Sequence, residues 1–195
     1  MEGTHRLSGK DLIQVGIYTA MTLVTYFVIG MFNAFPVLYP VAFAVWPIAC
    51  GIPMMLYYTK ITSFGMLTIS GLIFGLFFFL IGYTWIALVW WTLGGLLADI
   101  VFRIGGYGSL RATMLSYACF CLGMMGCPAP LWLAGQAYWD TIQDSMGPQF
   151  VADLRQIMPP WLLFVGLAVL FVCGMLGALF GHRMLKKHFE RAGIA

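Results

Sequence analysis

Six long apolar stretches set the strongest limit on how this chain can fold. Crossing ~30 Å of hydrocarbon takes about 20 apolar residues in a helix, and each stretch is close to that length. The stretches are continuously apolar rather than alternating, which favours helices over a β-barrel. They are residues 12–30, 36–58, 61–82, 84–102, 112–134 and 160–182.

The composition indicates that lipid is the solvent of this chain. Hydrophobic residues make up 62% of it and charged residues 9%, whereas a soluble domain carries roughly 25% charged residues. The first stretch lacks the small-residue cleavage site of a secretory signal peptide, and further spans follow it. No segment between stretches is long enough for a second domain. We therefore expect an all-α integral membrane protein with one six-helix membrane domain over residues 1–195.

The positive charges predict the orientation of the helices. Lys and Arg gather in short loops on the cytoplasmic side of a membrane. When the loops alternate sides, Arg155 is the one cation on its side, and the other nine of the ten lie opposite. This distribution predicts that both termini are cytoplasmic and that residues 134–159 are outside. The nine are Arg6, Lys10, Lys60, Arg103, Arg111, Arg183, Lys186, Lys187 and Arg191.

The loops on the predicted outer side carry many aromatic residues and few charges. This composition suits a flat, largely apolar ligand that is held by stacking and a few polar contacts. Arg155 would then be the partner of a ligand carboxylate or phosphate. The same aromatics would also suit an interfacial belt, so both interpretations stay open. The candidate substrate-binding residues are Phe35, Tyr39, Trp85, Trp132, Gln136, Tyr138, Trp139 and Arg155.

The longest connection predicts two short surface helices, 137–146 and 149–158, separated at Gly147-Pro148, because glycine ends helices and proline opens them. An apolar stripe along them would lie on the outer mouth of the bundle. Asp140 and Asp144 would face water or a cation. The stripe consists of Trp139, Ile142, Met146, Phe150 and Leu154.

The sequence CPAP at residues 127–130 predicts a break near the outer end of the fifth apolar stretch. Two prolines so close together remove hydrogen-bond donors and kink or unwind a helix. Irregular backbone at membrane depth is tolerated where it is buried in protein or lines a cavity. The break therefore favours a pocket at this end of the bundle over a simple aromatic belt.

Other polar features have simpler interpretations. Asp99 is the only acidic residue within a stretch, and Arg103, four residues later, predicts an interfacial ion pair. The glycine-rich run 103–111 lacks the partners of a phosphate-binding loop and predicts a tight turn. The five cysteines lie in apolar spans, and the three histidines fall on the cytoplasmic side. We therefore expect no metal site, no cofactor and no partner nucleic acid.

Gly16 and Ala20 lie four residues apart on one face of the first stretch. This spacing lets two helices approach closely in lipid, where packing drives helix association. On spacing alone, the pair would serve either packing inside the bundle or contact with another protein. Gly71/Gly75 and Gly177/Gly181 have similar spacing, and we interpret both as internal packing.

The segments SGKDLIQVGIYTAM at the start of the first helix and KKHFERAGIA after the glycine-rich last one resemble the substrate-binding S components of energy-coupling factor (ECF) transporters. The likeness is greatest to the Trep_Strep, or MptD-like, family, and it covers essentially the whole chain. It implies a protein of the prokaryotic plasma membrane that works with a transmembrane T component and two cytoplasmic ATPase subunits. It also implies that Gly16 and Ala20 meet the T component.

The resemblance implies a membrane-embedded binding protein without ATPase activity of its own, and the sequence has no Walker motif. We therefore expect that the protein is not an enzyme. The substrate class stays open among vitamins, metal complexes and tetrapyrroles. An intramembrane hydrolase would need a Ser–His pair or paired acids at depth, which the spans lack. A self-sufficient secondary transporter or channel is the alternative, although such proteins often have repeats with paired broken helices, which the two halves of this chain do not show.

Overall fold

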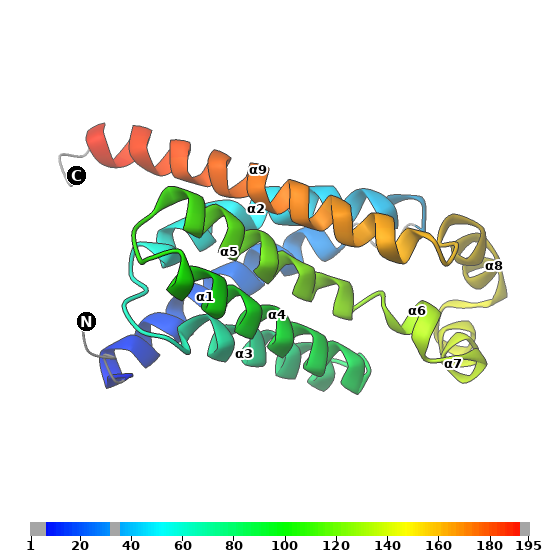
Figure 1. Ribbon diagram of the computed structural model, residues 1–195. Coiled ribbons are helices and arrows are strands. Elements are labelled where there is room, and N and C mark those ends of the chain that lie inside the picture. Colours follow the sequence, from blue (N-terminus) through cyan, green and yellow to red (C-terminus); the bar gives the residue numbers. More distant parts are fainter. Residues whose placement is uncertain (1–6, 32–35, 192–195) are drawn as a thin grey trace.

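The computed structural model of the protein describes residues 7–31 and 36–191, and its regular elements there are all helical. Six longer helices form one bundle (Figure 1). They are α1 (Gly9–Gly30), α2 (Tyr39–Tyr58), α3 (Met66–Leu80), α4 (Trp85–Ile104), α5 (Leu110–Leu122) and α9 (Leu162–Arg191). The shorter elements are η2 (Pro36–Leu38), η3 (Gly123–Gly126), α6 (Pro130–Leu133), α7 (Gln136–Met146) and α8 (Pro148–Ile157).

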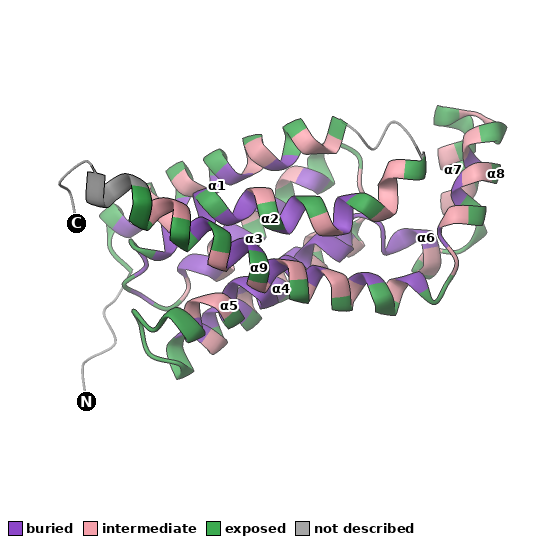
Figure 2. Ribbon diagram, turned by 90° about the horizontal axis from the view of Figure 1, so that it is seen from above, coloured by how far each residue is buried: buried purple, intermediate pink, exposed green. Residues whose placement is uncertain are grey.

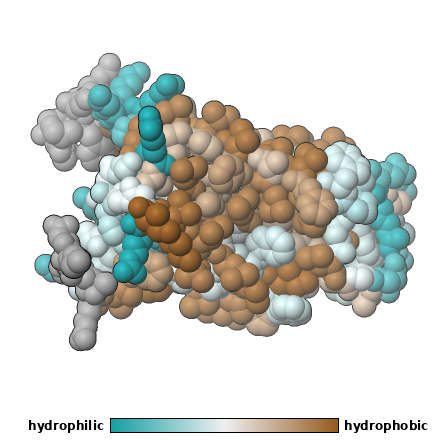
Figure 3. Space-filling view, in the orientation of Figure 1, coloured by the Kyte–Doolittle hydropathy of each residue, from teal (hydrophilic) through white to brown (hydrophobic). Residues whose placement is uncertain are grey.

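Four helices are long and apolar enough to cross a membrane, namely α1, α2, α4 and α9. The apolar helices Met66–Leu80 and Leu110–Gly126 are shorter, so the expected spans 61–82 and 112–134 are too long. The molecular surface carries a broad hydrophobic belt with hydrophilic residues at both ends (Figure 3). Both the helices and the belt are those of a multi-pass membrane protein.

Helices α2 and α9 run side by side with their backbones in contact. A Cβ atom added to Gly51 would lie 2.2 Å from the carbonyl oxygen of Gly177, and one added to Gly181 would lie 2.4 Å from that of Gly51. Similarly, a Cβ on Gly71 of α3 would lie 2.4 Å from the Trp91 oxygen of α4. These distances confirm internal packing for the glycine pairs of α3 and α9, because any side chain there would force the helices apart.

Large aromatic side chains fill the space between the helices. The rings of Phe74 and Trp91 stack with centroids 4.5 Å apart, and Phe120 meets both rings edge-on. The buried residues follow the helix faces that are turned toward one another, while the outward faces are exposed (Figure 2). The bundle differs from a soluble protein in one respect: its exposed faces are apolar as well.

The predicted ion pair between Asp99 and Arg103 is wrong. The Asp99 carboxylate is 2% exposed and accepts hydrogen bonds from the backbone N–H groups of Gly65 at 3.1 Å and Thr68 at 2.7 Å. The Arg103 guanidinium instead lies 5.4 Å from the centroid of the Phe64 ring. The first N–H groups of a helix have no partner within it, and leaving them unpaired is costly in lipid. Asp99 therefore caps α3, an assignment that i, i+4 spacing could not reveal.

This cap also explains why α3 begins only at Met66. Gly65 precedes the helix with φ +102°, a conformation that side chains disfavour. The carboxylate also accepts from the Leu67 N–H at 3.4 Å, so one side chain pairs three backbone N–H groups at the start of the helix. Residues 61–65, which the sequence placed in a span, form the turn that brings these groups to Asp99.

We expect Asp99→Ala to lower the free energy of unfolding by about 2 to 3 kcal/mol, because several buried N–H groups lose a charged acceptor. Asp99→Asn should retain part of the stability, since its amide oxygen still accepts. Arg103→Gln is the matched control and should change stability little. Thermal unfolding of the purified variants in detergent measures these effects. Equal losses for Asp99→Ala and Arg103→Gln would restore the ion-pair interpretation.

Candidate functional site

The candidate site lies at the end of the bundle where α5 is interrupted, opposite the first turn of α1 and the last turns of α9 (Figure 1). Helix α5 ends at Leu122, continues as the 3-10 turn η3, and gives way to α6 at Pro130. The predicted break at CPAP is confirmed, and it begins earlier than expected. All residues from 123 to 131 are buried, so this irregular backbone is enclosed by protein rather than exposed to lipid.

Helices α7 and α8 lie across this end of the bundle and confirm the two predicted surface helices. Gly147 joins them with φ +90°, and Pro148 opens the second. Of the predicted apolar stripe, Leu154 is 2% exposed, and Trp139, Ile142 and Phe150 are partly buried against the core. Met146 departs from it with 59% exposure, because it is the last residue before the turn and faces away from the bundle.

Four of the predicted binding residues meet around one cavity of about 390 Å³. Arg155 Nη2 donates a hydrogen bond to Gln136 Oε1 at 2.9 Å, and its guanidinium lies 4.7 Å from the centroid of the Trp139 ring. Trp132 forms another part of the wall. The cavity thus combines two indole rings, an amide and a cation, supplied by three of the short helices and held together by contacts between them.

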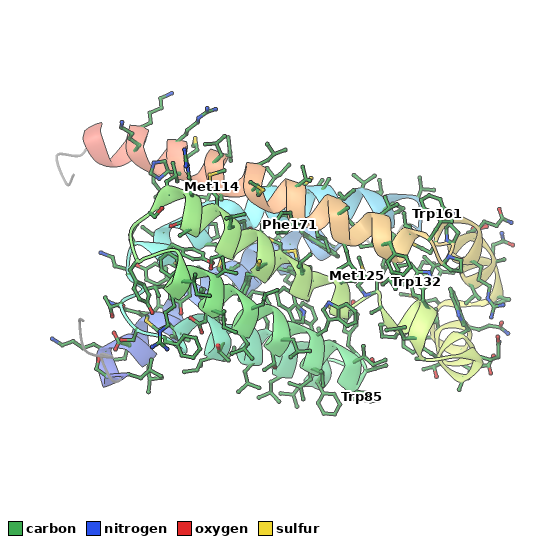
Figure 4. All side chains as sticks on the ribbon, in the orientation of Figure 1. Trp85, Met114, Met125, Trp132, Trp161 and Phe171 are labelled. Carbon is green, nitrogen blue, oxygen red and sulfur yellow. The ribbon has the colours of Figure 1, made fainter. Side chains whose placement is uncertain are left out.

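A hydrogen bond anchors this wall to the end of α8. Trp132 Nε1 donates to the Met158 backbone oxygen at 3.0 Å, which ties α6 to the segment that enters α9. Figure 4 shows Trp132 at this junction, with Trp161 nearby and Trp85 on the far side of the bundle. The ring of Trp132 is therefore placed by a specific bond and not only by packing.

Three tyrosines and a cysteine lie near one another; they do not line this cavity, but Tyr138 precedes its wall residue Trp139 on α7. Burial raises the pKa of Tyr138 to about 12, and the Cys127 thiol nearby adds to this effect. Burial also raises the pKa of Tyr83, reinforced by Cys127 and Tyr138. Tyr39 is near enough to Tyr83, Tyr138 and Cys127 to interact with them electrostatically. These phenols are neutral at physiological pH, and each can donate or accept a hydrogen bond.

A second, smaller recess of about 150 Å³ lies between α1, α2 and α3. Its walls include Tyr26 and Trp46, whose rings stack with centroids 4.5 Å apart, and the ring of Phe78. Trp46 Nε1 is buried, and among the described residues it has no hydrogen-bond partner. Tyr83 also lines this recess, which brings the recess close to the tyrosine cluster.

Tyr26, Trp46 and Phe78 are not among the predicted binding residues, because they lie inside apolar spans, where aromatic residues usually serve packing. Trp85 is 66% exposed and lines neither cavity. Phe35 lies outside the described residues. Asp140 accepts a hydrogen bond from Gln136 Nε2 at 2.8 Å on an exposed surface. Among residues 7–31 and 36–191, no group of three potential metal ligands comes together.

Gly16 and Ala20 are exposed on the outer face of α1. A Cβ added to Gly16 would have no atom within 4 Å, in contrast to the glycines of α3 and α9. Packing inside the bundle therefore does not account for the pair. Ile13 and Ile17 beside it are 63% and 54% exposed, so this face of α1 presents an apolar surface with a shallow notch of small residues.

Comparison with known proteins gives one match. A family model described as a hypothetical bacterial integral membrane protein (Trep_Strep) matches residues 9–191. No curated protein and no solved structure matches the chain.

We expect Trp132→Phe to lower the free energy of unfolding by about 1 kcal/mol, because the ring remains but the bond to the Met158 oxygen is lost. Trp161→Phe is a suitable control, since Trp161 is a neighbouring tryptophan with 60% exposure. Chemical unfolding followed by circular dichroism compares the two. An unchanged stability for Trp132→Phe would mean that this bond does not hold the junction.

Proposed function

The chain belongs to the Trep_Strep family of bacterial integral membrane proteins, and on this premise we propose that it is the substrate-binding S component of an ECF importer. The observation that carries the proposal is the cavity beside the broken α5, where Trp132, Gln136, Trp139 and Arg155 converge. A binding protein without its own ATPase must select its cargo before the energised step. Its site would then open outward, as the position of this cavity suggests.

The proposal includes six membrane crossings with both termini in the cytoplasm of a prokaryotic cell. In its support, the start of α1 and the end of α9 lie at one end of the bundle, and α7 and α8 at the other (Figure 1). The end with the termini carries the cationic residues of α9, such as Arg183 and Lys187. Cations at one end favour that end as the cytoplasmic one. The shorter α3 and α5 would complete their crossings through turns that are buried in protein.

The chemistry of the cavity favours a flat, largely apolar micronutrient with an acidic group. Indole rings offer stacking surfaces, and the guanidinium offers several donors to a carboxylate or phosphate. Arg155 uses one of its nitrogens for Gln136, and its remaining N–H groups would be available to a ligand. Vitamins, tetrapyrroles and metal complexes all contain members with these properties.

The exposed pair Gly16 and Ala20 supports a docking surface for the transmembrane T component. Small residues let a partner helix come close, and dispersion contacts then hold the two together. The T component would in turn join two cytoplasmic ATPase subunits, which would supply the energy for transport. This chain would contribute recognition and no catalytic step.

To test the site, the ligand that co-purifies with the protein is identified by mass spectrometry and titrated into apo protein by calorimetry. Trp139→Ala should weaken binding about tenfold, because the ligand loses a stacking surface. Tyr39→Ala should weaken it as well, and Arg155→Ala should do so strongly only for an anionic ligand. Trp85→Ala is the control and should bind as the parent does. If Trp139→Ala and Tyr39→Ala also bind as the parent does, the site lies elsewhere.

To test the partner, Gly16→Leu and Ala20→Leu are expressed together with the T component and the ATPase subunits. Each variant should fold and bind ligand normally but lose co-purification with the other subunits, since a bulky side chain prevents close helix contact. Thr25→Leu, at a partly exposed position of α1, should assemble normally. Retained assembly and transport by both small-residue variants would contradict the docking role.

A further inference from the structure

The largest of the cavities described lies at the end of the bundle that carries the termini, far from the candidate substrate site. Its volume is about 750 Å³, within the usual range of small-molecule sites. The ends of α2, α4 and α9 and the start of α5 enclose it. Apolar side chains form much of its wall, among them Met55, Leu56, Phe102, Leu110 and Leu185.

Among the residues whose side chains the structure describes, three basic side chains and no acidic side chain line this cavity. Lys60 comes from the turn after α2, while His182 and Lys186 are one helical turn apart on α9. The hydroxyl-bearing Thr59 and Thr113 add further polar groups to the wall. The cavity therefore presents cationic and donor groups over apolar walls, which is the pattern that binds an amphiphilic anion.

The depth of the cavity places its charges where a membrane surface would be. The apolar surface belt ends toward this end of the molecule and gives way to hydrophilic residues (Figure 3). On α9, the apolar run through Phe180 is followed by His182, Arg183 and Lys186. The glycine-rich turn after α4 also reaches the cavity through Gly108, whose φ is +95°. In a bilayer that covers the apolar belt, the basic groups would thus lie at headgroup level, with the apolar walls beneath them.

We propose that this cavity binds an anionic phospholipid. Its phosphate would lie between Lys60, His182 and Lys186, and an acyl chain would lie along Met55, Leu56 and Leu110. Basic pockets between membrane helices on the cytoplasmic side are known to bind lipid headgroups in this manner. A small soluble anion would use the cations but would leave the apolar walls without a partner. The site rests on the cytoplasmic placement of this end in the proposed function, but not on import itself.

The test counts phosphatidylglycerol and phosphatidylcholine that remain on the purified, delipidated and reconstituted full chain by native mass spectrometry. The parent should retain one phosphatidylglycerol in preference to phosphatidylcholine. Lys60→Gln and Lys186→Gln should each weaken this retention roughly fivefold. Arg183→Gln and Lys187→Gln are matched controls, since they remove the same charge from exposed positions on the same turns of α9 but outside the cavity lining.

A steric variant separates the cavity from general surface charge. Thr113→Trp keeps every cation and fills part of the cavity, so it should also lose the retained lipid. Equal losses for the controls and the cavity variants would overturn the proposal in favour of a diffuse electrostatic effect. Retention by Thr113→Trp would overturn it as well. Displacement of the lipid by millimolar inorganic phosphate would reassign the site to a free anion.

Discussion

The contact between the backbones of α2 and α9 supports much of this architecture. In lipid, helices gain no hydrophobic stabilisation from meeting one another, so close packing and hydrogen bonds must hold them together. Gly51, Gly177 and Gly181 allow the two helices to touch over more than one turn. Because α9 enters directly from α8 and ends beside the cationic cavity, this one contact positions elements at both ends of the molecule.

The two ends of the bundle differ in how their backbone N–H and C=O groups are shielded from lipid or paired in hydrogen bonds. At the end with the termini, two helices begin with side-chain caps, formed by Ser8 and Asp11 on α1 and by Asp99 on α3. At the other end, α5 stops early and its continuation consists of turns that the neighbouring helices bury. Irregular backbone is costly in contact with lipid. Here the neighbouring helices enclose the irregular backbone, and the candidate substrate cavity lies beside it.

The sequence predicted the elements whose signals are local. Hydropathy located the six long helices, Gly147-Pro148 located the junction of α7 and α8, and the prolines of CPAP located the break in the fifth. The sequence-based prediction failed where a residue that is distant in the sequence determines the local structure. Asp99 determines the start of α3 from 31 residues away, and Trp46 lines a recess together with Tyr26, which stacks on it from another helix. Trp85, which the sequence placed in a loop, is the first residue of α4 and lines neither the substrate cavity nor the recess.

The length of α9 has a mechanical consequence. Its 30 residues make a rod of about 45 Å, which exceeds the ~30 Å of hydrocarbon. A change of about 10° in the tilt of such a rod, pivoting at its α8 end, would sweep its far end through about 8 Å. Backbone contact with α2 means that the two helices must move as one body. A small rearrangement beside the substrate cavity would therefore be amplified as a large displacement of the charged end.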